Sequence, residues 1–187
     1  MNATVTLGLV LAFAAGTALA AEPPAAQSAK WVSRKVDFAF QGFTSTYSCD
    51  GLREDVATLL TALGARKQDL KLRSSPCAAP GISELSKFPE VHGTISVLVP
   101  ATAEEAGQAD PAIVPAHWQS IDLTHVRGFD NRHDGQCELL EQTKRYLLPL
   151  FTSRNLDFTS DCVPHQEMLN GVTFKVEVLQ PDPKPAS

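Results

Sequence analysis

The chain has 187 residues, 43% of them hydrophobic, and a formal net charge of −5 at pH 7. An acidic balance offers little attraction to a phosphate backbone, so the composition argues against nucleic acid as a partner. Residues 1–20 carry no charged side chain and contain an apolar run, residues 7–15, followed by Ala18-Leu19-Ala20. This pattern is typical of a cleaved secretory signal peptide. Because the run is shorter than the ~20 residues needed to cross a bilayer, we expect a periplasmic or secreted protein without a stable membrane anchor.

A cysteine followed by a helical pattern of apolar residues occurs twice, first at Cys49 and again at Cys137. From each cysteine onward the two stretches align without gaps. The similarity extends upstream, where the segment from Trp to Gly-Phe is one residue shorter in the second copy. The matched residues are Leu52 and Leu140, Leu59 and Leu147, Leu60 and Leu148, Arg66 and Arg154, Trp31 and Trp118, and Gly42-Phe43 and Gly128-Phe129. The same features in the same order indicate an internal duplication.

All four cysteines follow the predicted cleavage site, and an even number in an oxidising compartment indicates disulfide bonds. Three pairings are possible. A unit that once folded alone would close its own bridge, so the duplication favours Cys49 with Cys77 and Cys137 with Cys162. A zinc site is the weaker interpretation, because the one close pair, Cys162 and His165, has no second pair to complete four ligands.

In the first half, residues 21–30 are predicted to be a flexible leader. Residues 31–43 alternate between apolar and polar side chains, which predicts a half-buried strand. Residues 52–63 carry an apolar stripe of helical period, with Ser48 or Asp50 able to cap the start and Gly64 the end. Short strands are expected at 69–73 and 94–99.

In the second half, the alanine- and proline-rich residues 101–116 are predicted to be a linker. We expect strands at 121–126, 156–158 and 172–178, and a helix over about 138–148 that Pro149 ends or kinks. Residues 181–187 are expected to be a disordered tail.

The sequence therefore predicts an α+β protein made of two tandem β-α-β-β units, at residues 31–100 and 117–180. Each unit is expected to consist of an antiparallel sheet with one packed helix and one internal disulfide. A unit of this size buries little core alone, so we expect the two to pack against each other.

Residues 130–135, together with Glu141, partly match a calcium-binding loop. Arg132 occupies a position that should donate oxygen, so a turn leading into a helix is the favoured interpretation. His92, His117, His125, His133 and His165 show no paired ligand spacing. Asp130, His133 and Asp134 stay as weak metal candidates, and no cofactor is expected.

Four aromatic residues at matched positions, Trp31, Trp118, Phe43 and Phe129, could line a ligand groove, but a place in the core is favoured. There is no G-x-S-x-G nucleophile motif, and oxidised cysteines offer no thiolate. The leading functional hypothesis is a non-catalytic binding or interaction module of the cell envelope, with an envelope protein or a small ligand as partner. The alternative is a hydrolase or metal-dependent enzyme that uses the Asp130, His133 and Asp134 cluster.

The stretch Tyr47-Ser48-Cys49-Asp50-Gly51-Leu52-Arg53 resembles a stretch found in exported, uncharacterised proteobacterial proteins. The resemblance covers mainly the first unit. It implies export from a bacterial cell and no particular activity.

Overall fold

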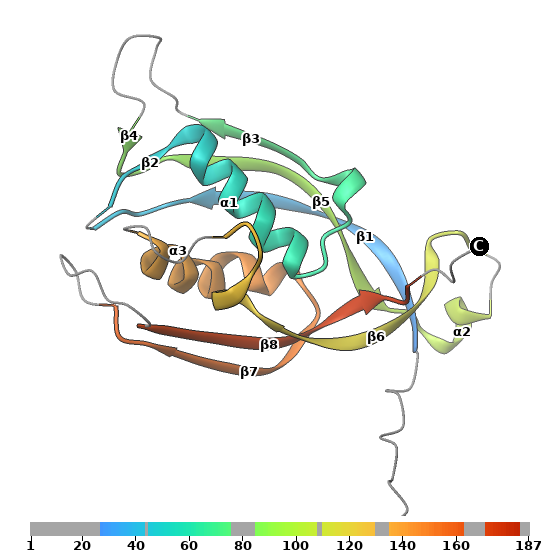
Figure 1. Cartoon of the computed structure of the whole chain (residues 1–187). Helices are drawn as coiled ribbons and strands as arrows, with labels where there is room; N and C mark the ends of the chain where they lie inside the picture. Colours follow the sequence, from blue (N-terminus) through green and yellow to red (C-terminus); the bar gives the residue numbers. More distant parts are fainter. Residues whose placement is uncertain are drawn as a thin grey trace, which may run out of the picture.

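The computed structural model describes residues 27–43, 45–75, 85–107, 110–129, 135–162 and 171–183. A six-stranded antiparallel sheet curves around two helices, α1 (Cys49–Ala62) and α3 (Gln136–Gln142), which lie on the same side of it (Figure 1). The strand order is β3 (Lys71–Ser75), β5 (Glu90–Pro100), β1 (Gln27–Ala39), β6 (Ile113–Asp122), β8 (Val172–Pro181) and β7 (Ser153–Ser160). The predicted α+β class with an antiparallel sheet is confirmed.

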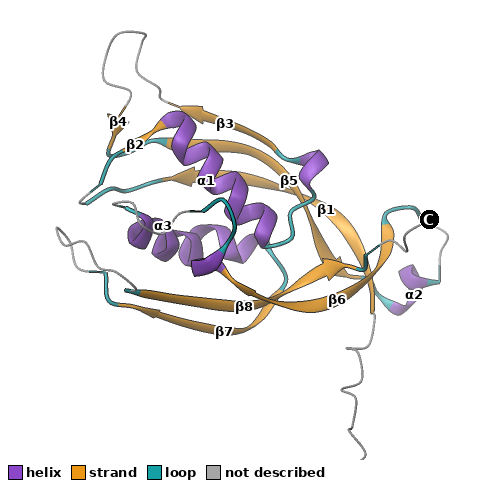
Figure 2. Cartoon of the chain, viewed as in Figure 1, coloured by secondary structure: helices purple, strands orange, loops and turns teal. Residues whose placement is uncertain are grey.

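The alternation of β1 determines which side of the sheet receives the helices. Val36 and Phe38, with Phe40 just beyond the strand, are at most 1% exposed, whereas Lys35 and Asp37 between them are exposed. Successive side chains of a strand point to opposite faces, so the apolar set packs on the face that α1 and α3 cover. Figure 2 shows both helices on this one face of the sheet. One apolar core contains residues from both helices and from strands of both halves.

The first helix, α1, forms where its capping and apolar residues predict it. Ser48 accepts a hydrogen bond from the Gly51 N–H at 3.0 Å, which satisfies one of the unpaired donors at the helix start. Leu59 and Leu60 are fully buried on its inner face. Gly64 follows the helix with a φ of 102°, a left-handed conformation that glycine adopts without steric cost.

The centre of the sheet lies where the sequence predicted a leader and a linker. Gln27–Lys30 of β1 pair with Ile113–Ala116 of β6, so residues 27–30 and 113–116 are strand, and the predicted boundaries at 31 and 117 are wrong. The linker prediction also missed α2 (Ala103–Ala106), a single turn capped by Thr102. The backbone N–H and C=O groups of these segments are satisfied by pairing with a distant part of the chain. The composition of each segment alone does not reveal that pairing.

A second, smaller apolar cluster surrounds this central pairing. It contains Ala29, Leu98, Ala116 and Leu179, with Trp31, Val114 and Trp118 packed against it. The last strand extends through Pro181, and the His117 ring lies 2.7 Å from an Asp182 carboxylate oxygen. Pro181 and Asp182, the first two residues of the predicted disordered tail, are therefore held in place. Residues 184–187 lie outside the described part.

The predicted strand at 121–126 is also wrong beyond Asp122. The Asp122 side chain accepts a hydrogen bond from the Thr124 N–H at 3.0 Å, which begins a 3₁₀ turn, η2 (Leu123–His125). Aspartate competes in this way with the sheet for backbone donors.

The second helix is shorter and less regular than the predicted helix over 138–148. After α3 the chain forms one π-helical turn, η3 (Thr143–Leu147), and then a 3₁₀ turn, η4 (Leu148–Leu150). Pro149 lies in this last turn, which agrees with its predicted role as a helix stop. Leu147 and Leu148 still face the core.

The Cys137–Cys162 disulfide is present, with 5.8 Å between the two Cα atoms. It connects the first turn of α3 to the segment that follows β7. Cys49, at the start of α1, is also disulfide-bonded. Cys77, its predicted partner, lies outside the described residues.

Candidate functional site

Two segments lie together at one end of the molecule, which we call the tip. We define it as residues 40–48, of which Thr44 lies outside the described part, and residues 85–89. The Phe40 N–H donates to the Pro89 carbonyl at 3.0 Å, and the Gly42 N–H donates to the Lys87 carbonyl at 2.8 Å. Further along the chain, β2 (Tyr47–Ser48) pairs with β4 (Leu85–Ser86). This end lies beside the start of α1 (Figure 1).

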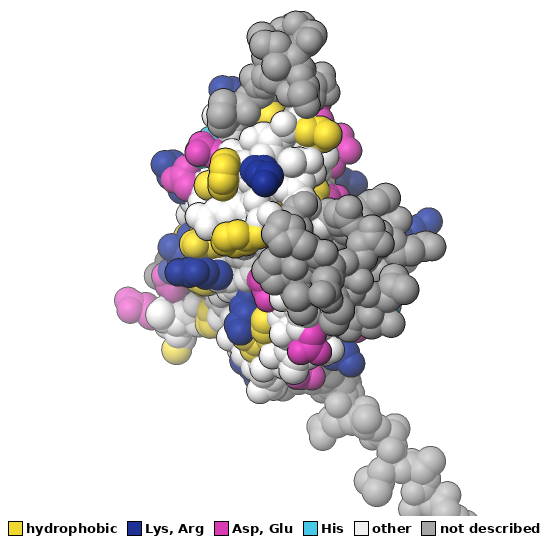
Figure 3. All heavy atoms as spheres, turned by 90° about the vertical axis from the view of Figure 1, so that its left-hand side faces the viewer, with side chains coloured by type: hydrophobic (Ala, Val, Ile, Leu, Met, Phe, Trp, Pro, Cys, Tyr) yellow, Lys and Arg dark blue, Asp and Glu magenta, His cyan; other side chains and the backbone are white. Residues whose placement is uncertain are grey.

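The tip exposes large apolar side chains. Phe43 is 65% exposed, Leu85 58% and Phe88 62%, which are the three highest values among the exposed large hydrophobic residues of the described part of the chain. Figure 3 looks at this side of the molecule and shows hydrophobic side chains at the surface with a basic side chain among them. Single exposed apolar residues are ordinary, but several on adjoining segments mark a contact surface.

Two side chains of α3 fix the tip to the rest of the fold. Glu138 accepts from the Phe43 N–H and from the Ser45 hydroxyl, each at 3.1 Å. One turn later, the Gln142 amide accepts from the Gln41 N–H at 2.9 Å and donates to the Gln41 carbonyl at 3.0 Å. Residues four apart lie on the same face of a helix, so α3 supplies the hydrogen bonds that a neighbouring strand would supply.

The contact between α3 and the tip is close enough to require glycine. A Cβ on Gly135 would lie 2.2 Å from the Ser45 hydroxyl oxygen and 3.1 Å from the Tyr47 ring, and its φ is 96°. Tyr47 itself is 9% exposed and packs edge-on against Phe40. Burial raises the pKa of the Tyr47 hydroxyl well above its usual range, and the charges of Asp55 and Glu138 add to this effect. The tip is therefore anchored by a buried polar cluster that joins it to both helices.

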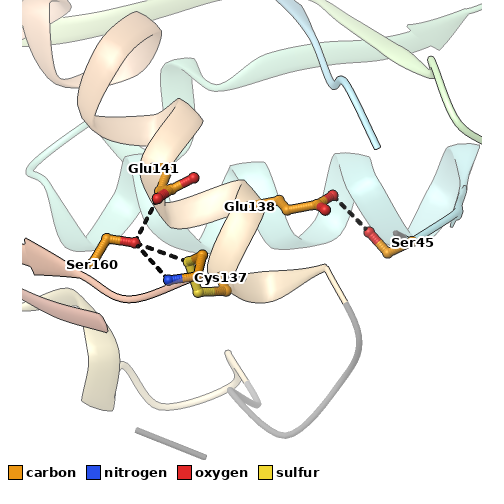
Figure 4. The surroundings of a disulfide bond; sticks show 6 residues. Ser45, Cys137, Glu138, Glu141 and Ser160 are labelled. Carbon is orange, nitrogen blue, oxygen red and sulfur yellow. Dashed lines mark hydrogen bonds between the residues drawn. A yellow bond between two sulfur atoms is a disulfide. The ribbon is translucent and has the colours of Figure 1, made fainter. Parts of the chain in front are cut away.

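The disulfide lies on the other side of α3 from the tip. Figure 4 shows Glu138 directed towards Ser45, whereas Glu141 is directed towards Ser160. The Ser160 hydroxyl donates to Glu141 at 2.5 Å and accepts from the Cys162 N–H at 3.3 Å. Glu141 and Ser160 thus form a hydrogen bond with each other, and Ser160 also accepts one from the main chain after β7. This geometry indicates a structural role.

The weak metal candidates Asp130, His133 and Asp134 lie outside the described residues, so the structure does not test them. They directly precede Gly135 and α3 in the sequence. Among the residues that are described, no group of three or more His, Cys, Asp and Glu side chains is arranged to hold a metal ion. Cys162 is oxidised, which leaves no thiolate for the zinc site considered from the sequence.

The described histidines pair with nearby carboxylates. The His92 ring lies 3.0 Å from Asp37 and 2.9 Å from Glu90 on the surface of the sheet. The hydrogen bond to Asp37, followed by that to Glu90, raises the pKa of His92. Both ring nitrogens are engaged, and the group is exposed on a flat strand surface, so it resembles a surface ion pair more than a catalytic base.

The four matched aromatic residues differ in how far they are buried. Trp31 and Trp118 pack on the smaller apolar cluster, where the Arg66 guanidinium lies 5.4 Å from the Trp31 ring and that of Arg154 lies 4.2 Å from the Trp118 ring. Phe129 is 5% exposed. Phe43 was also predicted to be core and is exposed, so for this residue the prediction was wrong.

No protein family, curated protein or solved structure matches the chain. Within the described part, no helix has the length and apolar character needed to cross a membrane.

Proposed function

We propose that the protein is a non-catalytic binding or interaction module of the cell envelope, periplasmic or secreted, and that the tip is its contact surface. The observation that supports this most is the exposure of Phe43, Leu85 and Phe88 on two adjoining segments. Water disfavours such exposure by roughly 25 cal/mol for each Å² of apolar surface. A partner that covers these side chains would recover that free energy.

The way in which α3 holds the tip supports the same proposal. Among the described residues, Glu138 and Gln142 form hydrogen bonds with Gln41, Phe43 and Ser45, and those with Gln41 and Phe43 involve main-chain groups of the tip. The position of Phe43 is therefore set by its backbone, whatever its side chain. A contact surface that is already ordered loses little conformational entropy when it binds.

A photo-crosslinking side chain placed at position 43 in living cells tests the proposal, with the same side chain at position 88 as a second site. Position 156 is the matched control, because Leu156 is 43% exposed on β7, an edge strand that β6 and β8 separate from β1, the strand that leads into the tip. We expect adducts with an envelope component, whether protein, small ligand or lipid, from positions 43 and 88 and not from 156. Equal labelling at the three positions, or no adduct from the tip, would contradict the proposed function.

We also propose that the scaffold consists of two tandem β-α-β-β units, β1-α1-β3-β5 and β6-α3-β7-β8. In the sheet, the first strand of each unit lies at the centre, its last strand lies next, and its middle strand lies at the edge. Arg66 contacts Trp31 in the first unit, and Arg154 contacts Trp118 in the second. The internal duplication matches the two arginines with each other and the two tryptophans with each other. Both features support a two-fold relation between the units.

A further inference from the structure

The tip contains one charged side chain. Residues 40–48 and 85–89 contain no acidic side chain, and Lys87 is their single basic one. Since 20% of the whole chain is charged, these fourteen residues would carry about three charges at the average frequency. The three most exposed large apolar side chains thus share a surface with one cation.

We propose that the tip inserts shallowly into the surface of an envelope lipid bilayer, with Phe43, Leu85 and Phe88 among the upper acyl chains and Lys87 at the level of the phosphates. The inference rests on the proposed function and names lipid as the partner, in place of the envelope protein or small ligand expected from the sequence. Elements that lie in the membrane interface combine Phe and Leu side chains with Lys or Arg, the residue types that the tip exposes. A lysine stem can follow the apolar surface while its ammonium group stays in water.

The size of the patch favours lipid over a protein partner. Three side chains of this kind, each about 60% exposed, present about 400 Å² in all. A stable protein interface buries about 800 Å² on each partner, about twice the area that these three side chains present. Lysine is also depleted from protein interfaces, whereas a juxtamembrane lysine is attracted to anionic lipids.

The charges that flank the tip limit how deeply it can enter. Along the chain, Glu84 and Glu90 directly flank residues 85–89, and Asp37 and Asp50 lie within three residues of residues 40–48. Carboxylates are strongly disfavoured in hydrocarbon. The tip would therefore enter only as far as its uncharged residues reach. This gives reversible contact, which agrees with the expectation of no stable membrane anchor.

Vesicle flotation of the protein as isolated from the cell tests the inference, with phosphatidylcholine vesicles and with vesicles that also contain phosphatidylglycerol. The variants are the double substitution Phe43→Ser and Phe88→Ser, the single substitution Lys87→Gln, and Leu156→Ser as the control. We expect the double variant to bind both vesicles at least about tenfold more weakly for each phenylalanine removed. Lys87→Gln should lower binding to the anionic vesicles by about fivefold, and Leu156→Ser should change neither.

The inference is overturned if the parent protein floats with neither vesicle, or if the double variant floats as well as the parent. Crosslinking from position 43 to an envelope protein, without vesicle binding, would overturn the lipid partner while the proposed function stands. Absence of both crosslinks and vesicle binding would remove the proposed function as well. Near-UV circular dichroism of each variant shows whether the fold is retained.

Discussion

Replacing Glu138 with alanine should destabilise the fold and release the tip. The carboxylate is 9% exposed and accepts hydrogen bonds from the Phe43 N–H and the Ser45 hydroxyl. Without it, two buried or half-buried donors lose their acceptor, since Ser45 is 4% exposed. An unsatisfied buried donor costs about 1–3 kcal/mol.

The magnitude follows from these two donors and from one opposing effect. Two hydrogen bonds to a charged group contribute about 1.5–3 kcal/mol each. Burying a carboxylate carries a desolvation penalty, which the substitution removes. We therefore expect Glu138→Ala to lower the free energy of unfolding by about 2–4 kcal/mol, and Glu138→Gln, which keeps one carbonyl acceptor, to lower it by less.

Urea denaturation of the oxidised protein measures this difference, and Glu54→Ala is the matched control. Glu54 also lies on a helix, but its side chain is 75% exposed, so its removal should stay within about 0.5 kcal/mol. Hydrogen exchange adds a local readout, because the Phe43 amide should lose protection in Glu138→Ala and keep it in Glu54→Ala. If Glu138→Ala unfolds at the same urea concentration and with the same slope as the parent, α3 does not hold the tip, and the argument for a preordered contact surface fails.

Three further outcomes test the covalent framework, the core and the surface charges. Peptide mapping without reduction should find Cys49 joined to Cys77, and a bridge from Cys49 to another residue would contradict the self-contained units. Leu59→Ala should lower the free energy of unfolding by about 2–5 kcal/mol, because the side chain is fully buried; an unchanged midpoint and slope would show that α1 does not face the core. The hydrogen bond to Asp37 raises the pKa of His92 above 6.5, so the stabilisation from protonated His92 should be complete below pH 6.5 and disappear as the pH rises through the raised value. Denaturation at a series of pH values should show this loss in the parent and not in His92→Asn.

Local periodicity was enough to predict most elements of the fold. The alternation around Val36 and Phe38 and the apolar stripe of α1 depend on neighbours within a few turns, and these elements are where the sequence places them. The strand segments 27–30 and 113–116 were missed because each forms by pairing with the other. Composition assigned both to flexible segments, since alanine and proline also occur in linkers.

The tip was harder to predict than the fold. In the sequence, Gly42-Phe43 ends an alternating strand, and nothing nearby indicates that Phe43 turns outward. Its orientation depends on Glu138, which is 95 residues away and accepts its N–H. Glu138 and Gln142 lie on one face of the predicted helix, roughly opposite Leu140 and Leu147, where polar side chains are expected to meet solvent. Nothing in the sequence therefore indicated that these two side chains bind a distant segment.

The two phenylalanines that the duplication matches give the sharpest test of what the tip contributes. Phe129 is 5% exposed and belongs to the core, whereas Phe43 is 65% exposed. If the exposed ring has no part in folding, Phe43→Ala should change the free energy of unfolding by no more than about 0.5 kcal/mol, while Phe129→Ala should lower it by about 3–5 kcal/mol. Chemical denaturation of the two variants under the same conditions measures both effects. Because Glu138 binds the backbone of residue 43, alanine keeps that hydrogen bond, and any loss of stability must come from the ring. Equal losses in the two variants would mean that the Phe43 ring packs within the fold, and it would then be unavailable to a partner.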